Sequence, residues 1–323
     1  MNWTRLFFFF PIAISFAMTV SLMPFFIGYF QMKKHGQPIR EEGPKWHNVK
    51  AGTPTMGGAV FLVAITVTSL IFSLFQCVLT AEMWIMLAIL LLYGTLGFLD
   101  DFIKIFKQRN MGLTSLQKLV GQIVGGILLY TVFKAKGYPT TLSLPFNVTL
   151  DLGILYGVFV VIWLVGFSNA VNLTDGLDGL VAGLGTISFG TYAIIAWNQH
   201  QYDVLLVCLA VMGGLLGFFL FNKKPAKIFM GDVGSLALGG LLASISIILK
   251  QEWTLLLVGL VYVIETLSVI MQVTSFKLTG KRIFKMSPIH HHFEMVGWSE
   301  WKINFVFWSV GLIMSILTLT ILY

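Results

Sequence analysis

Acidic, amide and imidazole side chains gather in a few short segments of a chain that is otherwise apolar. Asp100 and Asp101 are adjacent, and Lys104 follows one helical turn after Asp100. Two neighbouring carboxylates repel each other unless a cation offsets their charge, and Mg²⁺ is a hard cation that binds carboxylates together with substrate phosphates. The pair therefore predicts a magnesium site. An ion pair between Asp100 and Lys104 that ends a helix is the alternative interpretation.

The segment 168–180 carries a polar side chain at every third position, namely Asn169, Asn172, Asp175 and Asp178. Its two Asp-Gly pairs indicate that the backbone turns just before the next apolar run. A turn alone needs fewer polar side chains than this segment has, so the pattern favours a ligand site. The spacing of the oxygen ligands and the missing terminal glutamate exclude an EF-hand loop.

Two further segments have a composition suited to phosphate chemistry, and a third is rich in glycine. Asp232 precedes an apolar run, where it could act as a helix N-cap, and lysines in 222–227 could attract a phosphorylated substrate. Three consecutive histidines occupy 290–292; they lack the spacing of a zinc-binding helix, and imidazoles that donate to phosphate oxygens fit better. The glycine-rich segment 52–58 is most simply a loop that leads into an apolar run.

The elements that position these segments must lie in a membrane. Of the 323 residues, 57% are hydrophobic and 11% are charged, whereas soluble domains have about 25% charged residues. The mean hydropathy of +0.85 excludes a soluble enzyme, a disordered chain and a nucleic-acid-binding domain, despite the net charge of +7. The apolar runs are long and continuous, which favours helices over a barrel.

Cys77 and Cys208 have no CxxC partner and are expected to be packed thiols.

A helix needs about 20 apolar residues to cross the hydrocarbon layer, and the chain 1–323, taken as a single domain, offers ten such runs. The first is too long for a signal peptide, the fourth is short, and the ninth is interrupted by Glu265. The expected spans are 6–30, 55–75, 83–99, 119–133, 152–167, 180–197, 204–221, 235–249, 254–276 and 303–322.

The distribution of basic residues predicts the orientation of these spans. With ten spans, seventeen of the 21 Lys and Arg residues fall on one side of the membrane. The positive-inside rule places that side in the cytoplasm and both termini outside the cytoplasm. Seven of the 14 acidic residues lie at the cytoplasmic ends of spans. Because a carboxylate beside hydrocarbon is costly, such residues are candidates for function.

Together, the five segments resemble the phospho-N-acetylmuramoyl-pentapeptide-transferase family from Lys50 to Trp298. The Asp-Asp, Asn-x-x-Asp-Gly-Leu-Asp-Gly and Met-Gly-Asp segments are typical of the wider superfamily of polyprenyl-phosphate sugar-1-phosphate transferases, and Pro-x-His-His-His-Phe-Glu indicates the muramoyl branch. The resemblance implies an all-α polytopic membrane fold of ten helices with a broken ninth helix. It also implies an active site facing the cytoplasm, a multi-pass location in the bacterial cytoplasmic membrane, and a homodimer.

The implied reaction moves phospho-N-acetylmuramoyl-pentapeptide from its UDP carrier to undecaprenyl phosphate, with Mg²⁺, and yields lipid I and UMP. This is the first membrane step of peptidoglycan synthesis, and therefore of cell wall biogenesis, cell shape and cell division. The chain has no Walker A or dinucleotide fingerprint, as expected if one phosphoanhydride is exchanged for another. The same chemistry with UDP-N-acetylglucosamine is the main alternative; a secondary transporter is another, but transporter acids lie near the midplane in symmetric repeats.

The resemblance also implies residue roles. Asp232 is the expected principal Mg²⁺ ligand, with Asp100 and Asp101 completing the cluster. Phosphate oxygens would be held by Lys104, His290, His291 and His292. The nucleoside and diphosphate pocket would be formed by Lys50, Thr55, Asn172, Asp175, Gly176, Leu177, Asp178, Asn222 and Phe229, with Phe229 stacking on uracil.

Two acidic residues leave alternatives open. Asp100 is often proposed in this family as the base that deprotonates the lipid phosphate. A phosphate monoester has its second pKa at about 6 and is already largely a dianion at neutral pH, so we expect Asp100 chiefly to position Mg²⁺ or Lys104. A covalent aspartyl-phosphate route is a further possibility. Glu265, in the ninth span, could simply pair within the bundle.

Overall fold

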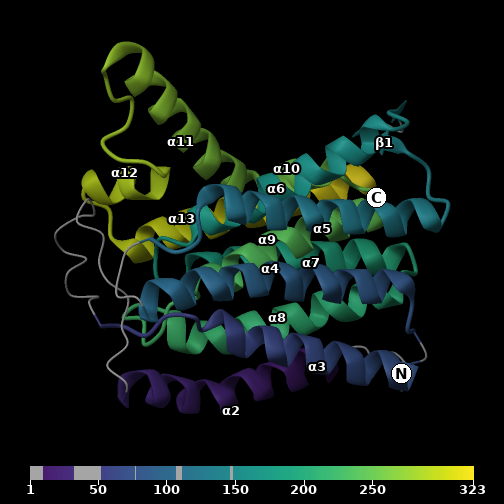
Figure 1. The fold of residues 1–323 in the computed structure, drawn as a ribbon, viewed down its shortest axis with the longest axis horizontal. Helices are drawn as coiled ribbons and strands as arrows, with labels where there is room; N and C mark the ends of the chain where they lie inside the picture. Colours follow the sequence, from purple (N-terminus) through teal and green to yellow (C-terminus); the bar gives the residue numbers. More distant parts are fainter. Residues whose placement is uncertain (1–9, 33–51, 77, 107–110, 146–147) are drawn as a thin grey trace.

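The computed structural model describes residues 10–32, 52–76, 78–106, 111–145 and 148–323. Ten of the described helices are long and apolar enough to cross a membrane, and they lie side by side as a bundle (Figure 1). They are α2 (Phe10–Met32), α3 (Gly58–Gln76), α4 (Ala81–Phe106), α5 (Ser115–Ala135), α6 (Leu155–Thr174), α7 (Leu180–Asn198), α8 (Tyr202–Asn222), α9 (Gly231–Ile248), α11 (Leu260–Thr279) and α13 (Glu300–Leu322). The described structure also contains two short helices, α10 (Thr254–Val258) and α12 (Ile289–Met295). A hairpin is formed by β1 (Thr141–Ser143) and β2 (Thr149–Asp151).

The prediction of an all-α polytopic membrane protein with ten spans is confirmed. The ninth span is divided into α10 and α11, as the resemblance implies, but the division lies at Gly259 and not at Glu265. Glu265 is in the interior of α11, where a buried partner allows a carboxylate to continue the helix. Beyond Gly259, α11 diverges from the other helices and projects from the bundle (Figure 1).

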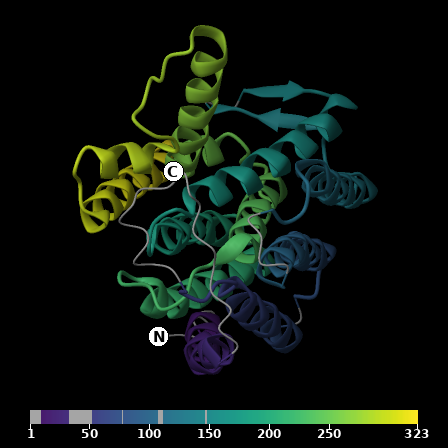
Figure 2. The ribbon, with the colours of Figure 1, turned by 60° about the vertical axis from the view of Figure 1, so that its left-hand side comes forward.

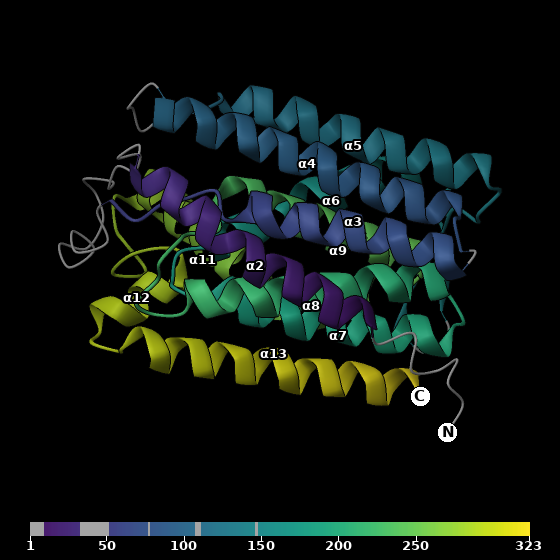
Figure 3. The same ribbon diagram turned by 90° about the horizontal axis from the view of Figure 1, so that it is seen from below.

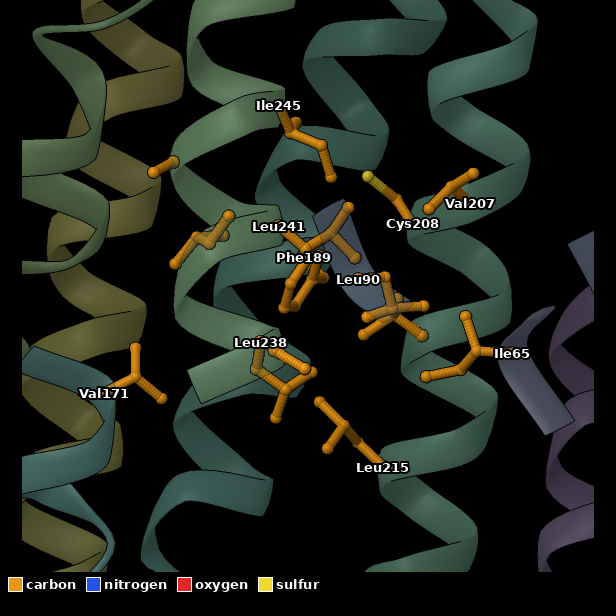
Figure 4. Close-up of a cluster of buried hydrophobic side chains, with 14 of the residues drawn as sticks. Ile65, Leu90, Val171, Phe189, Val207, Cys208, Leu215, Leu238, Leu241 and Ile245 are labelled. Atoms are coloured by element: carbon orange, nitrogen blue, oxygen red, sulfur yellow. The ribbon is translucent and has the colours of Figure 1, made fainter. Parts of the chain in front are cut away.

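Helix α9 forms the centre of the bundle, packed between α4 and α6 and also contacting α3 and α7. Figure 2 shows it surrounded by the other helices. Its sequence is apolar or small on every side, as expected for a helix without a solvent face, and 16 of its residues are buried. Leu238, Leu241 and Ile245 of α9 pack with Phe189 of α7 and with Cys208 of α8 (Figure 4).

The cysteine predictions have different outcomes. Cys208 is a buried free thiol, as expected, whereas Cys77 lies outside the described residues.

Glycines allow α4 and α9 to approach closely at one end of the bundle. A Cβ atom added to Gly97 would lie 2.1 Å from the carbonyl oxygen of Asp232, and one added to Gly58 of α3 would lie 2.4 Å from the backbone nitrogen of Gly234. Both contacts are with backbone, so a larger residue could not be accommodated by moving a side chain. The last turns of α4 are thereby held against the first turn of α9.

The opposite end of the bundle is closed by a polar cluster around Lys250. Its ammonium group donates to the carbonyl oxygen of Pro139 and to the hydroxyl of Tyr156, and it lies 3.0 Å from a carboxylate oxygen of Glu252. The Tyr156 hydroxyl donates to the same glutamate, which is fully buried. These contacts tie the segment before β1 to the chain that follows α9.

The described chain begins and ends at this same end of the bundle. Figure 3 shows the start of α2 and the C-terminus together, opposite to α12. An even number of spans requires this arrangement. The placement of both termini outside the cytoplasm stays a prediction.

The close approach of α4 and α9 can be tested by Gly97→Ala, with Gly166→Ala on α6 as the matched control. Overpacking against backbone typically costs about 1–3 kcal/mol, so Gly97→Ala should lower the thermal unfolding midpoint of the protein in detergent. A Cβ on Gly166 meets nothing within 4 Å, and replacing a mid-helix glycine by alanine gains about 0.5–1 kcal/mol. Equal midpoints for the two variants would contradict the proposed packing.

Candidate active site

Three carboxylates from two helices converge at the α12 end of the bundle. Asp100 and Asp101 lie in the last two turns of α4, and Asp232 lies in the first turn of α9. Oxygen atoms of all three lie within 4.8 Å of one another. Asp100 and Asp101 are buried, with exposed fractions of 0% and 4%. A compact set of hard oxygen donors is suited to Mg²⁺, so the structure brings together all three predicted metal ligands.

Two lysines offset the charge of this cluster. The Lys104 ammonium lies 2.5 Å from Asp100 Oδ2 and 3.3 Å from Asp232 Oδ2. The Lys118 ammonium, from the first turn of α5, lies 2.7 Å from Asp232 Oδ2 and 3.1 Å from Asp100 Oδ1. The alternative of a simple helix-ending pair is therefore incomplete, because Lys104 reaches across to α9.

Lys118 is a residue of this site that we did not predict from the sequence, where it counted only toward the cytoplasmic charge. A signal was available: the connection from α4 to α5 is short, so Lys118 must return to the end of the bundle that holds Asp100 and Asp101.

Backbone groups fix the orientation of the two α4 carboxylates. Asp100 Oδ1 accepts a hydrogen bond of 2.7 Å from the N–H of Leu113, and Asp101 Oδ2 accepts one of 3.3 Å from the N–H of Val233. Gly231 has a φ of +76°, which favours glycine, and a Cβ there would lie 2.4 Å from Asp101 Oδ2. The carboxylates are thus held in place by the segment before α5 and by the start of α9.

Asp232 is not the N-cap of α9, in contrast to the alternative considered from the sequence. Met230 occupies that position, and its side chain makes no capping bond. Asp232 Oδ1 instead accepts a hydrogen bond of 2.9 Å from the Asn172 amide, which also donates to Ser235. The last turn of α6 therefore joins the acidic cluster.

The polar stripe of α6 continues from this contact in both directions. One turn deeper in the bundle, Asn169 donates to Gln122 of α5 at 3.1 Å. Asp175 follows the end of α6, and burial raises the pKa of its carboxyl to about 8, with a further contribution from the negative charges of Asp232, Asp101 and Asp178. A raised carboxyl pKa is the expected result of partial burial beside other negative charges.

Some of the predicted substrate residues direct their polar atoms toward the protein itself. Asn222 accepts from the N–H of Gly179 and donates to the carbonyl of Ile228, both at 2.9 Å. Asp178 accepts a 3.1 Å bond from the N–H of Ala226. These bonds hold the turn after α6 against the lysine-rich segment that precedes α9. Leu177, 3% exposed, packs within the same turn.

The glycine-rich segment before α3 pairs with the segment before α9. Phe229 donates its N–H to the carbonyl of Pro54 at 2.8 Å, and Gly57 donates to the carbonyl of Phe229 at 2.9 Å. Thr55 is buried, and its hydroxyl has no hydrogen-bond partner. That hydroxyl lies beside Gly231 and therefore close to Asp101. Lys50 lies outside the described residues.

The first of the three histidines contacts the segment that follows α6. His290 is fully buried, and its Nδ1 lies 3.0 Å from Oε2 of Glu265. A Cβ on Gly176 would lie 2.2 Å from Nε2 of His290. The histidine segment therefore packs directly against the predicted nucleotide pocket.

The other two histidines have different partners. His291 Nδ1 lies 2.6 Å from Glu294 Oε2, within α12. His292 Nδ1 accepts a 3.2 Å bond from the N–H of Lys285. The three imidazoles, expected from the sequence to act alike, thus have three distinct environments.

Comparisons with known proteins agree with this geometry. The model of Glycosyl transferase family 4 matches residues 83–250, and the phospho-N-acetylmuramoyl-pentapeptide-transferase signature 1 matches residues 50–62. The chain is 70% identical to the phospho-N-acetylmuramoyl-pentapeptide-transferase of Enterococcus faecalis over 100% of both chains. It is 69% identical to that of Enterococcus hirae over 99% of both, and 60% identical to that of Lactiplantibacillus plantarum over 94% of both.

Binding of Mn²⁺, followed by electron paramagnetic resonance, tests the acidic cluster as a metal centre. We expect the protein to bind one Mn²⁺ ion and Asp232→Asn to bind at least about tenfold more weakly, because a carboxylate ligand is lost. The matched control is Asp203→Asn, since Asp203 is also a carboxylate in the first turn of a helix but accepts a hydrogen bond from Thr80 at the other end of the bundle. Unchanged Mn²⁺ binding by Asp232→Asn would contradict this assignment.

Proposed function

The chain belongs to the phospho-N-acetylmuramoyl-pentapeptide-transferase family, and from this we propose that it transfers phospho-N-acetylmuramoyl-pentapeptide from UDP to undecaprenyl phosphate. The products are lipid I and UMP, and Mg²⁺ is the cofactor. The chain is a multi-pass membrane transferase. The observation that carries the finer proposal is the cluster of three carboxylates and two lysines at one end of the membrane-spanning bundle.

The proposed reaction exchanges one phosphoanhydride bond for another. An oxygen of the lipid phosphate attacks the phosphorus that carries the sugar, and a new P–O–P bond forms. The bond from that phosphorus to the UMP oxygen breaks, and its electron pair leaves with UMP. No ATP is needed. Because phosphoryl transfer depends mainly on positioning and on neutralising charge, the site needs cations more than it needs a nucleophile of its own.

The donor set fits Mg²⁺ because it consists entirely of carboxylate oxygens. Asp232 would hold the ion together with Asp100 and Asp101. When bound, the ion supplies positive charge to the diphosphate oxygens. The ammonium groups of Lys104 and Lys118, already at the cluster, add charge on the same side and orient the phosphates.

The contacts of Asp100 favour a positioning role over that of a general base. One of its oxygens accepts from the N–H of Leu113 and lies 3.1 Å from Lys118, and the other lies 2.5 Å from Lys104. Both oxygens of Asp100 are therefore already engaged as acceptors within the protein. The lipid phosphate is also largely deprotonated near neutral pH, since its second pKa is about 6.

The site would face the cytoplasm. Most basic residues of the described chain lie at the end of the bundle that holds the acidic cluster, and the positive-inside rule assigns such an end to the cytoplasm. The bacterial cytoplasmic membrane is the proposed location, with the lipid substrate reaching the site from the bilayer. We also propose a homodimer, on the family resemblance alone.

The choice of donor is tested by UMP release in detergent with undecaprenyl phosphate and Mg²⁺. We expect release with UDP-N-acetylmuramoyl-pentapeptide and none above background with UDP-N-acetylglucosamine. Asp232→Asn should lower the rate at least about hundredfold, comparable to removing one charge-stabilising group from an active site. Preference for UDP-N-acetylglucosamine would support the alternative transferase, and full activity of Asp232→Asn would refute the role of the metal site.

The role of Asp100 is tested by the pH dependence of Asp100→Asn. If Asp100 positions Lys104 and the metal, the variant should lose activity by about tenfold or more, and the loss should be similar at every pH from 6 to 9. If Asp100 is the base, raising the pH deprotonates the lipid phosphate without help. Recovery of near-normal rates at alkaline pH would therefore contradict the positioning role.

A further inference from the structure

Glu265 is a fully buried carboxylate that the mechanism above does not use. It lies on the face of α11 that packs against the bundle, together with Val261, Ser268 and Gln272. Its Oε2 contacts His290, and its Oε1 has no hydrogen-bond partner. An ionised carboxylate buried without a counter-charge is strongly unfavourable, so this side chain requires a compensating proton or cation. His290 is the group in contact that can supply it.

The contact fixes which nitrogen of His290 faces Gly176, in the turn that follows α6. A carboxylate accepts hydrogen bonds, so Nδ1 carries a proton and donates it to Glu265. The ring then points its Nε2 in the opposite direction, against Gly176. That Nε2 is buried and has no hydrogen-bond partner. Since buried polar atoms are normally satisfied, this nitrogen is expected to meet a group that is not part of the protein.

The position of His290 is held by α11 at two points. Two turns after Glu265, Gln272 accepts from the N–H groups of Ile283 and Phe284 and donates to the carbonyl of Phe284, each at 2.9 Å. The segment that leads from α11 back to α12 is therefore bound to the same helix face that holds the imidazole. Glu265 and Gln272 together set both the place and the orientation of His290.

We propose that Glu265 is a positioning residue that keeps His290 doubly protonated and turns its Nε2–H toward the substrate. A pair of one carboxylate and one imidazolium has no net charge, which offsets part of the cost of burying either one alone. The remaining Nε2–H is then a charge-assisted donor that requires an anionic acceptor. A diphosphate oxygen of the nucleotide substrate has this chemistry; that identity rests on the proposed function, whereas the pairing of Glu265 with His290 does not.

The test is nitrogen NMR of the full chain in detergent with ¹⁵N-labelled histidine, combined with steady-state UMP release. His290→Gln identifies the resonances. We expect both ring nitrogens of His290 to show imidazolium shifts, and added UDP to move the Nε2 signal. Glu265→Gln keeps the shape but removes the charge, so His290 should become neutral. The kcat should fall by about ten- to hundredfold, the range seen for carboxylates that orient metal-binding histidines, with KM for the UDP-sugar changed less than kcat.

Two variants separate this role from a structural one. Glu252→Gln removes an equally buried carboxylate at the opposite end of the bundle, and it should leave both kcat and the His290 resonances unchanged. Glu265→Asp keeps the charge and should retain the imidazolium signal and part of the activity. A neutral His290 in the unmodified protein would overturn the proposal, as would an imidazolium His290 with kcat within twofold in Glu265→Gln. If no UDP-sugar released UMP, the proposed function would fail, but the NMR comparison would still decide the role of Glu265.

Discussion

The mutual repulsion of three closely spaced carboxylates, two of them buried, is the interaction on which the arrangement of this site depends. Asp100, Asp101 and Asp232 offer oxygens within 4.8 Å of one another, at an end of the bundle where burial makes each charge costly. The close packing at Gly97 forces this proximity. Cations must therefore be present, and Lys104 and Lys118 supply them from two helices. A divalent ion and a diphosphate can enter such a site together, because their charges compensate each other.

The remaining polar segments divide into those that face this cluster and those that hold it in place. Asn172 bonds to Asp232 directly, whereas Asn222 and Asp178 bond to backbone groups and join the segments before α7 and α9. Glu265 contacts neither the cluster nor these segments; it contacts His290, which packs against the turn after α6. The same segment can thus contain residues that face the acidic cluster and residues that hold it in place, although the sequence presents them as one motif.

The ten spans and the polar segments could be predicted because hydrocarbon imposes a strict rule: long apolar runs form helices, and polar exceptions have a function. What could not be predicted depends on contacts between helices. Glu265 does not break the ninth span, because its buried carboxylate contacts His290, 25 residues later. The break lies at Gly259 instead. Lys118 is one of many basic residues in the sequence, and only the return of α5 toward α4 distinguishes it. The separate environments of the three histidines likewise arise from tertiary packing.

Anomalous diffraction from crystals of the protein soaked in Mn²⁺ tests the central claim most directly, since it locates the ion without reference to activity. The account predicts one strong peak within coordination distance of carboxylate oxygens of Asp232 and of at least one of Asp100 and Asp101. A crystal structure in which these three side chains lie apart, or in which the strongest peak lies at another end or surface of the bundle, would contradict it.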